Sequence, residues 1–181
     1  MNTIVTTPWS AVIFDMDGVV TDTASLHAIA WKRLFDDVLA SPEVTSGDLP
    51  LSHHIDTTPF DRVEDYRRYV DGRPREDGVR TFLNARNIFL PEGDDDDPSS
   101  AHTIHGLARR KNDYFSVLLE REGIEVFSGT VKLIERLRRG GTPIGLVTAS
   151  RNAPQLLETA GIADLFDVVI DGQVALSLIH I

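Results

Sequence analysis

The stretch "AVIFDMDGVVTDT" at residues 11–23 decides the fold of this 181-residue chain. Its first half is a run of apolar residues, which is typical of a strand covered on both faces in a parallel sheet. Asp15 and Asp17 follow at the point where this strand ends. Because a buried carboxylate is costly unless it is paired or metal-bound, two of them here indicate a reactive or metal-binding site. Gly18 permits a tight turn directly after them.

Two further strands of the buried type come late in the sequence, "TPIGLVTAS" at 142–150 and "DVVIDG" at 167–172. Helical patterns at 130–141 and 153–166 precede and follow the first of these strands. The order strand, helix, strand, helix, strand with short links predicts an α/β fold with a doubly wound parallel sheet.

The residues between the first strand and the helical pattern at 130–141 differ in their pattern of apolar residues. Apolar residues recur there at helical spacing, so residues 22–122 are predicted to be a helical insertion placed directly after the first strand. Four segments within it carry the helical pattern: 24–39, with Thr23 as N-cap, and 60–70, 75–86 and 103–122.

Polar groups follow all three predicted strands: Asp15 and Asp17, then Thr148 to Ser150, then Asp171. In a parallel α/β sheet, ligands bind beyond the carboxyl ends of the strands. We therefore expect these groups to converge.

This set of groups suits phosphoryl transfer. An Asp carboxylate can attack phosphorus, and a second carboxylate two residues later can act as general acid and base. Carboxylates repel a phosphate, so Mg²⁺ is the expected cofactor. Thr148, with neighbouring amide groups at a helix N-terminus, can bind the transferring oxygens.

"FDMDGVVTDT" resembles the first motif of the haloacid dehalogenase-like phosphotransferase superfamily, and "LVTAS" resembles its second. "DTASLHAIAWKRL", "GRPREDGV" and "RRKNDYF" resemble, in the same order, cap segments of its β-phosphoglucomutase subfamily. The resemblance covers the chain to about Ala175. It implies a Rossmann-like core, residues 1–21 and 123–175, and an α-helical cap, residues 22–122.

The resemblance also implies roles for single residues. Asp15 matches the phosphorylated nucleophile, and Asp17 matches the general acid/base, whose backbone carbonyl would bind Mg²⁺ beside Asp15. Thr23 lies at the cap hinge. The residues that match positions binding phosphate or substrate are Gly18, Thr148, Ala149, Ser150, Arg151 and Asn152 in the core and His27, Arg75 and Lys111 in the cap.

Other interpretations of these residues remain open. An Asp-x-Asp pair after a strand can be a solvated turn, and a histidine on an apolar helix is often a core residue. Arg75 can be a surface charge at a helix start, and Lys111 can belong to a solvated helical face.

The resemblance implies a Mg²⁺-dependent enzyme that converts β-glucose 1-phosphate to glucose 6-phosphate through an aspartyl-phosphate. A sugar-phosphate phosphatase shares every motif and is the alternative. A third possibility, of another class, is an inactive fragment or a binding module. Segments such as "FDRVEDYRRYVDGRPREDGVRTFL" also resemble proteins in which this domain is fused to a sugar phosphorylase.

The chain departs from the family pattern at its end, where no lysine follows Lys132 and no acidic residue follows Asp171. Residues 176–181, "LSLIHI", match the translation of a transposon end used as a sequencing adapter, so we expect them to be non-native and the core to be truncated. A core of this length is expected to expose its first strand as a sheet edge, to bind Mg²⁺ weakly and to turn over little substrate.

Composition excludes several classes of function. The formal net charge of −10 argues against non-specific binding to nucleic acid or to an anionic membrane. The absence of cysteine excludes disulfides and thiolate chemistry. No signal peptide and no run of roughly 20 apolar residues is present, so we predict a cytoplasmic protein, either a monomer or part of a larger fused enzyme.

Overall fold

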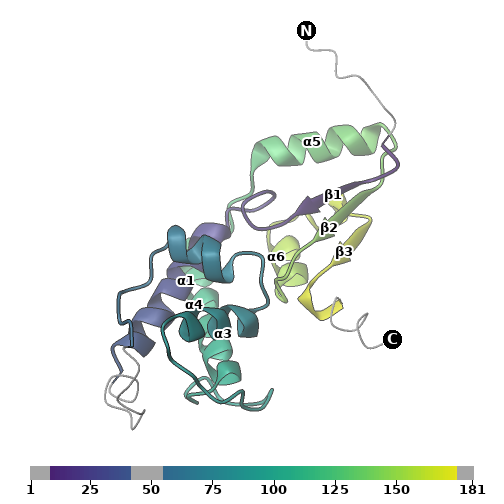
Figure 1. The fold of residues 1–181 in the computed structure, drawn as a ribbon. Helices are drawn as coiled ribbons and strands as arrows, with labels where there is room; N and C mark the ends of the chain where they lie inside the picture. Colours follow the sequence, from purple (N-terminus) through teal and green to yellow (C-terminus); the bar gives the residue numbers. More distant parts are fainter. Residues whose placement is uncertain (1–8, 42–54, 175–181) are drawn as a thin grey trace. The chain divides into compact units, whose positions relative to one another are not determined.

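The computed structural model describes residues 9–41 and 55–174. The chain forms two compact units (Figure 1). One, here called the sheet unit, combines the chain up to Ala24 with the chain from Ile124 onward, and the other, the helical unit, is Ser25–Gly123. The predicted adapter-derived residues 176–181 lie outside the described residues.

The sheet unit contains three parallel strands, β1 (Val12–Asp15), β2 (Ile144–Val147) and β3 (Val168–Ile170). Their order is β1-β2-β3, so the predicted parallel α/β arrangement is confirmed. In the described part of the chain β1 lies at a sheet edge, as expected from the sequence.

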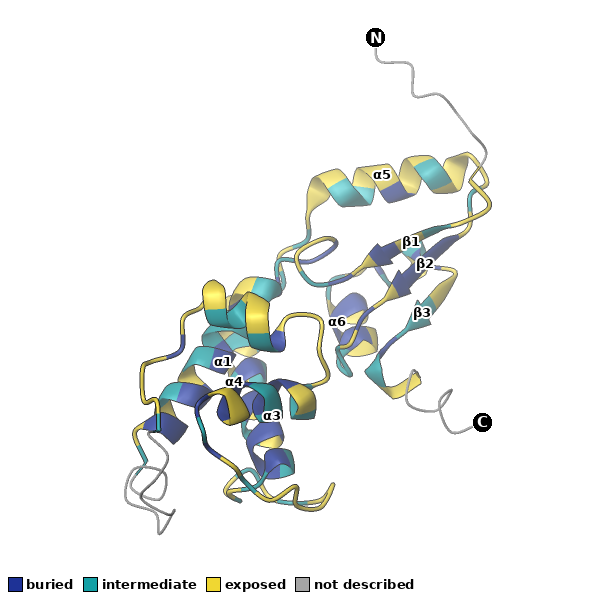
Figure 2. Cartoon of the chain, viewed as in Figure 1, coloured by how far each residue is buried: buried dark blue, intermediate teal, exposed yellow. Residues whose placement is uncertain are grey.

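The strands of this sheet contain both buried and exposed residues (Figure 2), and these residues lie on opposite faces. Phe14 and Leu146 are buried on one face, whereas Ile13 is 68% exposed and Val168 is 52% exposed on the other. The connections from β1 to β2 and from β2 to β3 both move along the sheet in the same direction. Right-handed connections of this kind place their helices on the same face of the sheet. The prediction of a first strand covered on both faces is wrong for the described residues, since covering the second face requires a crossover in the opposite direction.

The crossover helices are α5 (Ser128–Arg139) and α6 (Ala153–Thr159). The sequence predicted a single helix over 153–166, which is too long. The chain turns at Gly161, whose φ of +67° lies in the left-handed region, and continues as a short 3-10 turn, η2 (Ala163–Leu165).

The helical unit is built from α1 (Ala24–Leu39), α3 (Arg75–Ala85) and α4 (Ile104–Glu122), with a five-residue π-helical turn, η1 (Tyr66–Val70). The predicted helix over 24–39 is confirmed to the residue, and those over 75–86 and 103–122 are confirmed to within one residue. The segment 60–70 is helical only in its second half.

An aromatic cluster forms the core of the helical unit. The Phe35 ring lies 4.0 Å from the Phe82 ring and 5.2 Å from the Phe60 ring, measured between centroids. Trp31 stacks on Phe35 at 5.2 Å. Offset aromatic pairs at these distances stabilise a core beyond the area that they bury.

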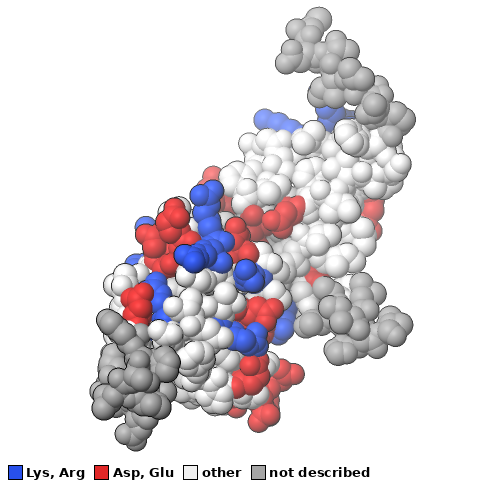
Figure 3. Space-filling view, in the orientation of Figure 1, with Lys and Arg blue, Asp and Glu red and all other residues white. Residues whose placement is uncertain are grey.

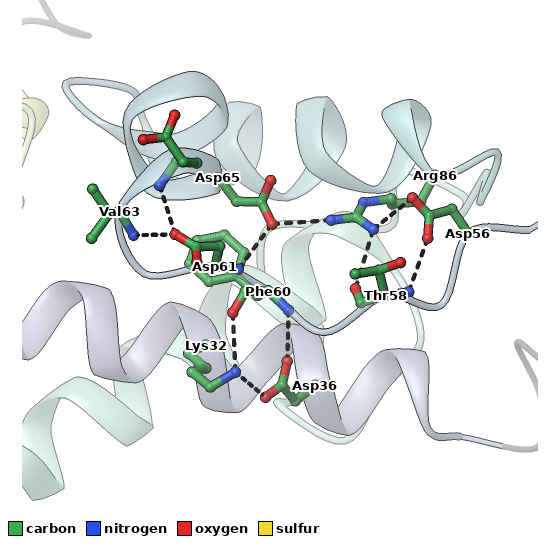
Figure 4. Close-up of polar contacts among 10 residues, drawn as sticks. Lys32, Asp36, Asp56, Thr58, Phe60, Asp61, Val63, Asp65 and Arg86 are labelled. Carbon is green, nitrogen blue, oxygen red and sulfur yellow. Dashed lines mark hydrogen bonds and ion pairs between the residues drawn. The ribbon is translucent and has the colours of Figure 1, made fainter.

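Side chains rather than a neighbouring strand hold the irregular segment that carries Phe60 (Figure 4). The Phe60 N–H donates to a carboxylate oxygen of Asp36 at 2.9 Å, and the Phe60 carbonyl accepts from Lys32 at 3.0 Å. Lys32 and Asp36, one turn apart on α1, also pair with each other at 2.8 Å. Both backbone groups of a buried residue are thereby satisfied.

Arg86 fixes the same segment from the end of α3. Its guanidinium, in a side chain only 7% exposed, donates to Asp56 at 2.7 Å, to Asp65 at 3.0 Å and to the Thr58 carbonyl at 3.1 Å. It also lies 4.8 Å from the centroid of the Phe82 ring. A buried cation with this many partners makes its removal costly.

We predict that Arg86→Ala lowers the free energy of unfolding by about 3 kcal/mol, because Asp65 keeps a largely buried charge without its cation. The matched control is Arg80→Ala. Arg80, on α3 itself, pairs with Asp77 and Glu92 at the surface, where such pairs contribute about 0.5 kcal/mol. Urea unfolding of both variants measures the difference, and equal losses would contradict the prediction.

Candidate active site

The loop after β1 is folded around one carbonyl oxygen. The Met16 carbonyl accepts from the backbone N–H groups of Val19, Val20 and Thr21 at 3.3, 2.9 and 3.0 Å. Gly18, with φ of +78°, donates to the Thr21 carbonyl at 2.8 Å. The chain therefore reverses within a few residues of the strand end, and Gly18 has the conformation that favours glycine.

The two carboxylates differ in their surroundings. Asp15 is exposed at the end of β1, and its Oδ1 accepts from the Met16 N–H at 2.8 Å. Asp17 is partly buried, and two threonines contact its two oxygens: Thr23 donates to Oδ1, and Thr148 donates to Oδ2 at 3.5 Å. One carboxylate is thus exposed, and the other is held by two hydroxyl groups.

Thr148, directly after β2, contacts residues at the ends of both β1 and β3. Its N–H donates to the Ile170 carbonyl at 3.0 Å, and its hydroxyl accepts from the Ser150 N–H at 3.1 Å. The Ser150 hydroxyl in turn accepts from the Asn152 N–H at 3.3 Å. Ala149 is exposed, and Arg151 and Asn152 are partly exposed, in the turn that leads into α6. The sheet unit therefore brings Asp17 and Thr148 into contact.

Asp171, the polar group predicted at the end of the third strand, accepts hydrogen bonds from the backbone that follows it. It is 4% exposed, and its Oδ1 accepts from the N–H groups of Gln173 and Val174 at 3.0 and 2.8 Å. This carboxylate stabilises the turn after β3.

The donor set at the end of β1 suits part of a Mg²⁺ shell. The Asp15 carboxylate and the Asp17 backbone carbonyl are hard oxygen donors two residues apart. No group of three His, Asp or Glu side chains within 9–41 and 55–174 is placed to hold a metal ion. Because Mg²⁺ keeps several waters and substrate oxygens, a two-residue contribution is compatible with it.

The helical unit has its own cluster of basic groups. Lys111 is 2% exposed, and its Nζ lies 2.5 Å from Nδ1 of His27. The His27 ring stacks on Phe115 with a centroid separation of 4.0 Å and an angle of 4°. The interpretation of Lys111 as part of a solvated helical face is wrong, since α4 presents this residue to the interior.

The same cluster lowers the basicity of His27. Burial, then the Lys111 ammonium and then the Arg75 guanidinium, which begins α3, hold the pKa of His27 well below its ordinary value of 6.5. His27 is therefore neutral at pH 7. A neutral imidazole that faces an ammonium through Nδ1 accepts there and carries its proton on Nε2.

Exposed charges of both signs lie side by side over the helical unit on the face that Figure 3 shows. The interior differs from this mixed surface, because Lys111 is buried beside His27, and both Lys111 and Arg75 lower the pKa of His27.

Sequence reasoning missed three contributors to these clusters. Thr21, fully buried, contacts the Thr23 hydroxyl at 2.8 Å and the Met16 carbonyl at 3.3 Å. Trp31 and Phe115 face Lys111. The available signal was helical spacing, since Trp31 follows His27, and Phe115 follows Lys111, by four residues.

Comparison with known proteins agrees with this arrangement. A family model for haloacid dehalogenase-like hydrolases matches residues 9–175. The chain belongs to this family.

The chain is similar to several curated proteins. It is 43% identical over 162 residues to a β-phosphoglucomutase of Mycobacterium bovis, covering 90% of this chain and 59% of that protein. It is 30% identical over 161 residues to a β-phosphoglucomutase of Bacillus subtilis, covering 89% of this chain and 60% of that protein. The chain thus spans about three fifths of the length of these relatives.

A third relative is far longer. A protein of Mycobacterium tuberculosis described as an uncharacterised glycosyl hydrolase is 35% identical over 170 residues, which are 93% of this chain and 12% of that protein. Among solved structures, a β-phosphoglucomutase of Clostridium difficile superposes with a TM-score of 0.64 at 27% identity, covering 91% of this chain and 62% of that one.

No helix within residues 9–41 and 55–174 is both long enough and apolar enough to cross a membrane.

We predict that acid destabilises the protein partly through His27. The pKa of His27 is depressed in the folded state, so the unfolded chain binds more protons below pH 6.5, and stability falls as the pH drops. His27→Asn keeps an acceptor near the position of Nδ1 but does not titrate. Between pH 7 and 5.5 the wild type should lose about 1 kcal/mol more than this variant in urea unfolding. Parallel pH profiles would contradict the prediction.

Proposed function

We propose that this protein transfers a phosphoryl group on a sugar phosphate through an aspartyl-phosphate formed on Asp15. The observation that carries the proposal is the pair of carboxylates after β1, one exposed and one held by Thr23 and Thr148. Relatives named β-phosphoglucomutase at 43% and 30% identity support the class of reaction.

In the proposed reaction, an oxygen of Asp15 attacks the phosphorus of the substrate, and the bond from phosphorus to the sugar oxygen breaks. Asp17, in its acid form, donates its proton to the departing sugar oxygen. In the second step the Asp17 carboxylate takes the proton of an acceptor hydroxyl, which attacks phosphorus and restores Asp15. The contacts with Thr23 and Thr148 keep Asp17 in position for both transfers.

Mg²⁺ bound by the Asp15 carboxylate and the Asp17 carbonyl would neutralise the charge that two carboxylates and a phosphate bring together. Thr148, with Ser150 and Asn152 in the turn that follows it, would bind phosphate oxygens. Gly18, Ala149 and Arg151 belong to the same proposed phosphate-binding set.

We propose that the helical unit acts as the cap and that residues 22–122, by the sequence boundaries, belong to it. His27, Arg75 and Lys111 would hold the substrate and, whenever the bound sugar carries a second phosphate, the one distal to Asp15. The support is their convergence within one unit and the burial of Lys111, which provides a positive charge with little competition from water.

The acceptor in the second step decides between two outcomes. If a sugar hydroxyl accepts the phosphoryl group, the product of β-glucose 1-phosphate is glucose 6-phosphate. If water accepts it, the products are glucose and free phosphate, as in a phosphatase. Exclusion of water during the lifetime of the aspartyl-phosphate separates the two.

We predict that the full-length protein with Mg²⁺ converts β-glucose 1-phosphate mainly to glucose 6-phosphate. Asp15→Asn should abolish turnover, because the amide is not a nucleophile for phosphorus. Asp17→Asn should lower kcat by at least about 10²-fold, since it removes the proton transfer. Coupled assays for glucose 6-phosphate and for free phosphate measure both products.

The matched control is Asp22→Asn, which changes a nearby carboxylate outside the proposed machinery and should retain activity. Release of free phosphate alone would favour the phosphatase alternative. Appreciable turnover by Asp15→Asn would contradict the proposed mechanism.

A further inference from the structure

Lys111 lies among three rings inside the helical unit. Its Nζ is 5.1 Å from the centroid of the Trp31 ring and 5.0 Å from that of the Phe115 ring. The third ring is His27, which accepts from Nζ and stacks on Phe115. The Trp31 and Phe115 rings contact Lys111 through their aromatic faces, and neither residue has a role in the proposed chemistry.

The side chains around Lys111 come from two helices, α1 and α4, at helical spacing. His27 and Trp31 are one turn apart on α1, and Lys111 and Phe115 are one turn apart on α4. Each pair therefore lies on one face of its helix. The enclosure follows from packing these two faces together, and all four side chains belong to the helical unit.

Packing confines the Trp31 ring from the side of α3. A Cβ added to Gly78 would lie 3.2 Å from Cη2 and Cζ2 of Trp31 and 3.2 Å from Cγ1 of Val70. This is tighter than ordinary van der Waals contact, so glycine at position 78 leaves the room that the indole occupies. Trp31 is 3% exposed. The ring has little freedom to move away from Lys111.

A cation over an aromatic face is attracted by the ring quadrupole, and the attraction is stronger when both groups are shielded from water. Lys111 meets this condition because it is buried. The neutral His27 adds a hydrogen-bond acceptor without adding a positive charge. The two rings and the imidazole thereby stabilise the ammonium without contributing a negative charge of their own.

We propose that Trp31 and Phe115 are positioning residues that hold the Lys111 ammonium, through their ring faces, for a phosphate dianion of the substrate. The inference rests on the proposed function, because it assumes that Lys111 binds the substrate's phosphate. It adds that the strength of this binding depends on the electron density of the Trp31 ring and not only on its volume.

The test is a series of fluorinated tryptophans. Fluorine weakens the ring quadrupole stepwise with little change in ring size, so packing stays nearly constant. Trp9→Phe removes the other tryptophan of residues 1–181, an exposed residue, and any tryptophan outside this stretch is also replaced by phenylalanine, so that Trp31 is the sole labelled ring. Titration of the full-length protein with inorganic phosphate, followed by the indole N–H resonance of Trp31, gives the affinity across the series.

We expect phosphate affinity to fall progressively from tryptophan to trifluorotryptophan, by about tenfold in total, with unchanged thermal unfolding midpoints. Affinity that stays constant or rises along the series would overturn the proposal.

Lys111→Met separates this inference from the function on which it rests. If this variant loses phosphate binding while the fluorinated series is flat, Lys111 keeps its binding role and only the role of the rings is refuted. If Lys111→Met binds phosphate as the wild type does, both assignments are wrong. Leu in place of Phe115 should weaken phosphate binding as well, and an unchanged affinity would refute the part of the proposal that concerns Phe115.

Discussion

The Met16 carbonyl is the point on which the candidate site depends. Four donors converge on it, the N–H groups of Val19, Val20 and Thr21 and the Thr21 hydroxyl. They turn the chain sharply after β1, so that Asp15 stays on the strand while Asp17 enters the loop and meets Thr23. Since successive strand residues point to opposite faces, a slip of one residue here would exchange the positions of Asp15 and Met16. The different surroundings of the two carboxylates, and hence their different proposed roles, follow from this turn.

Most of the fold was predictable because its signals are local. The three strands are short apolar runs between polar turns, and the helix over 24–39 has an unbroken 3.6-residue pattern. The error over 153–166 also had a local cause, because Gly161 ends a pattern that would otherwise continue. The segment before η1 gave no such signal. Arg86 and the pair Lys32–Asp36 hold it from positions more than twenty residues away, and propensity carries no information about such contacts.

The candidate site was predictable to a lesser degree. The motif at 11–23 indicated Asp15, Asp17 and Gly18, and the structure adds the contacts of Asp17 with two threonines. The buried state of Lys111 was not apparent, because "ARRKN" contains several basic residues and the pattern does not tell which of them faces the core. Packing of α4 against α1 makes that choice. It also makes Trp31 a neighbour of the ammonium.

The central claim is that the Asp15 carboxylate receives the phosphoryl group. The most direct measurement is a crystal structure of the full-length protein with Mg²⁺ and fluoroberyllate, which mimics a phosphoryl group on an aspartate. We expect beryllium bonded to an oxygen of Asp15, with Thr148 near its fluorines. Fluoroberyllate bonded to another residue, with Asp15 unmodified, would contradict it.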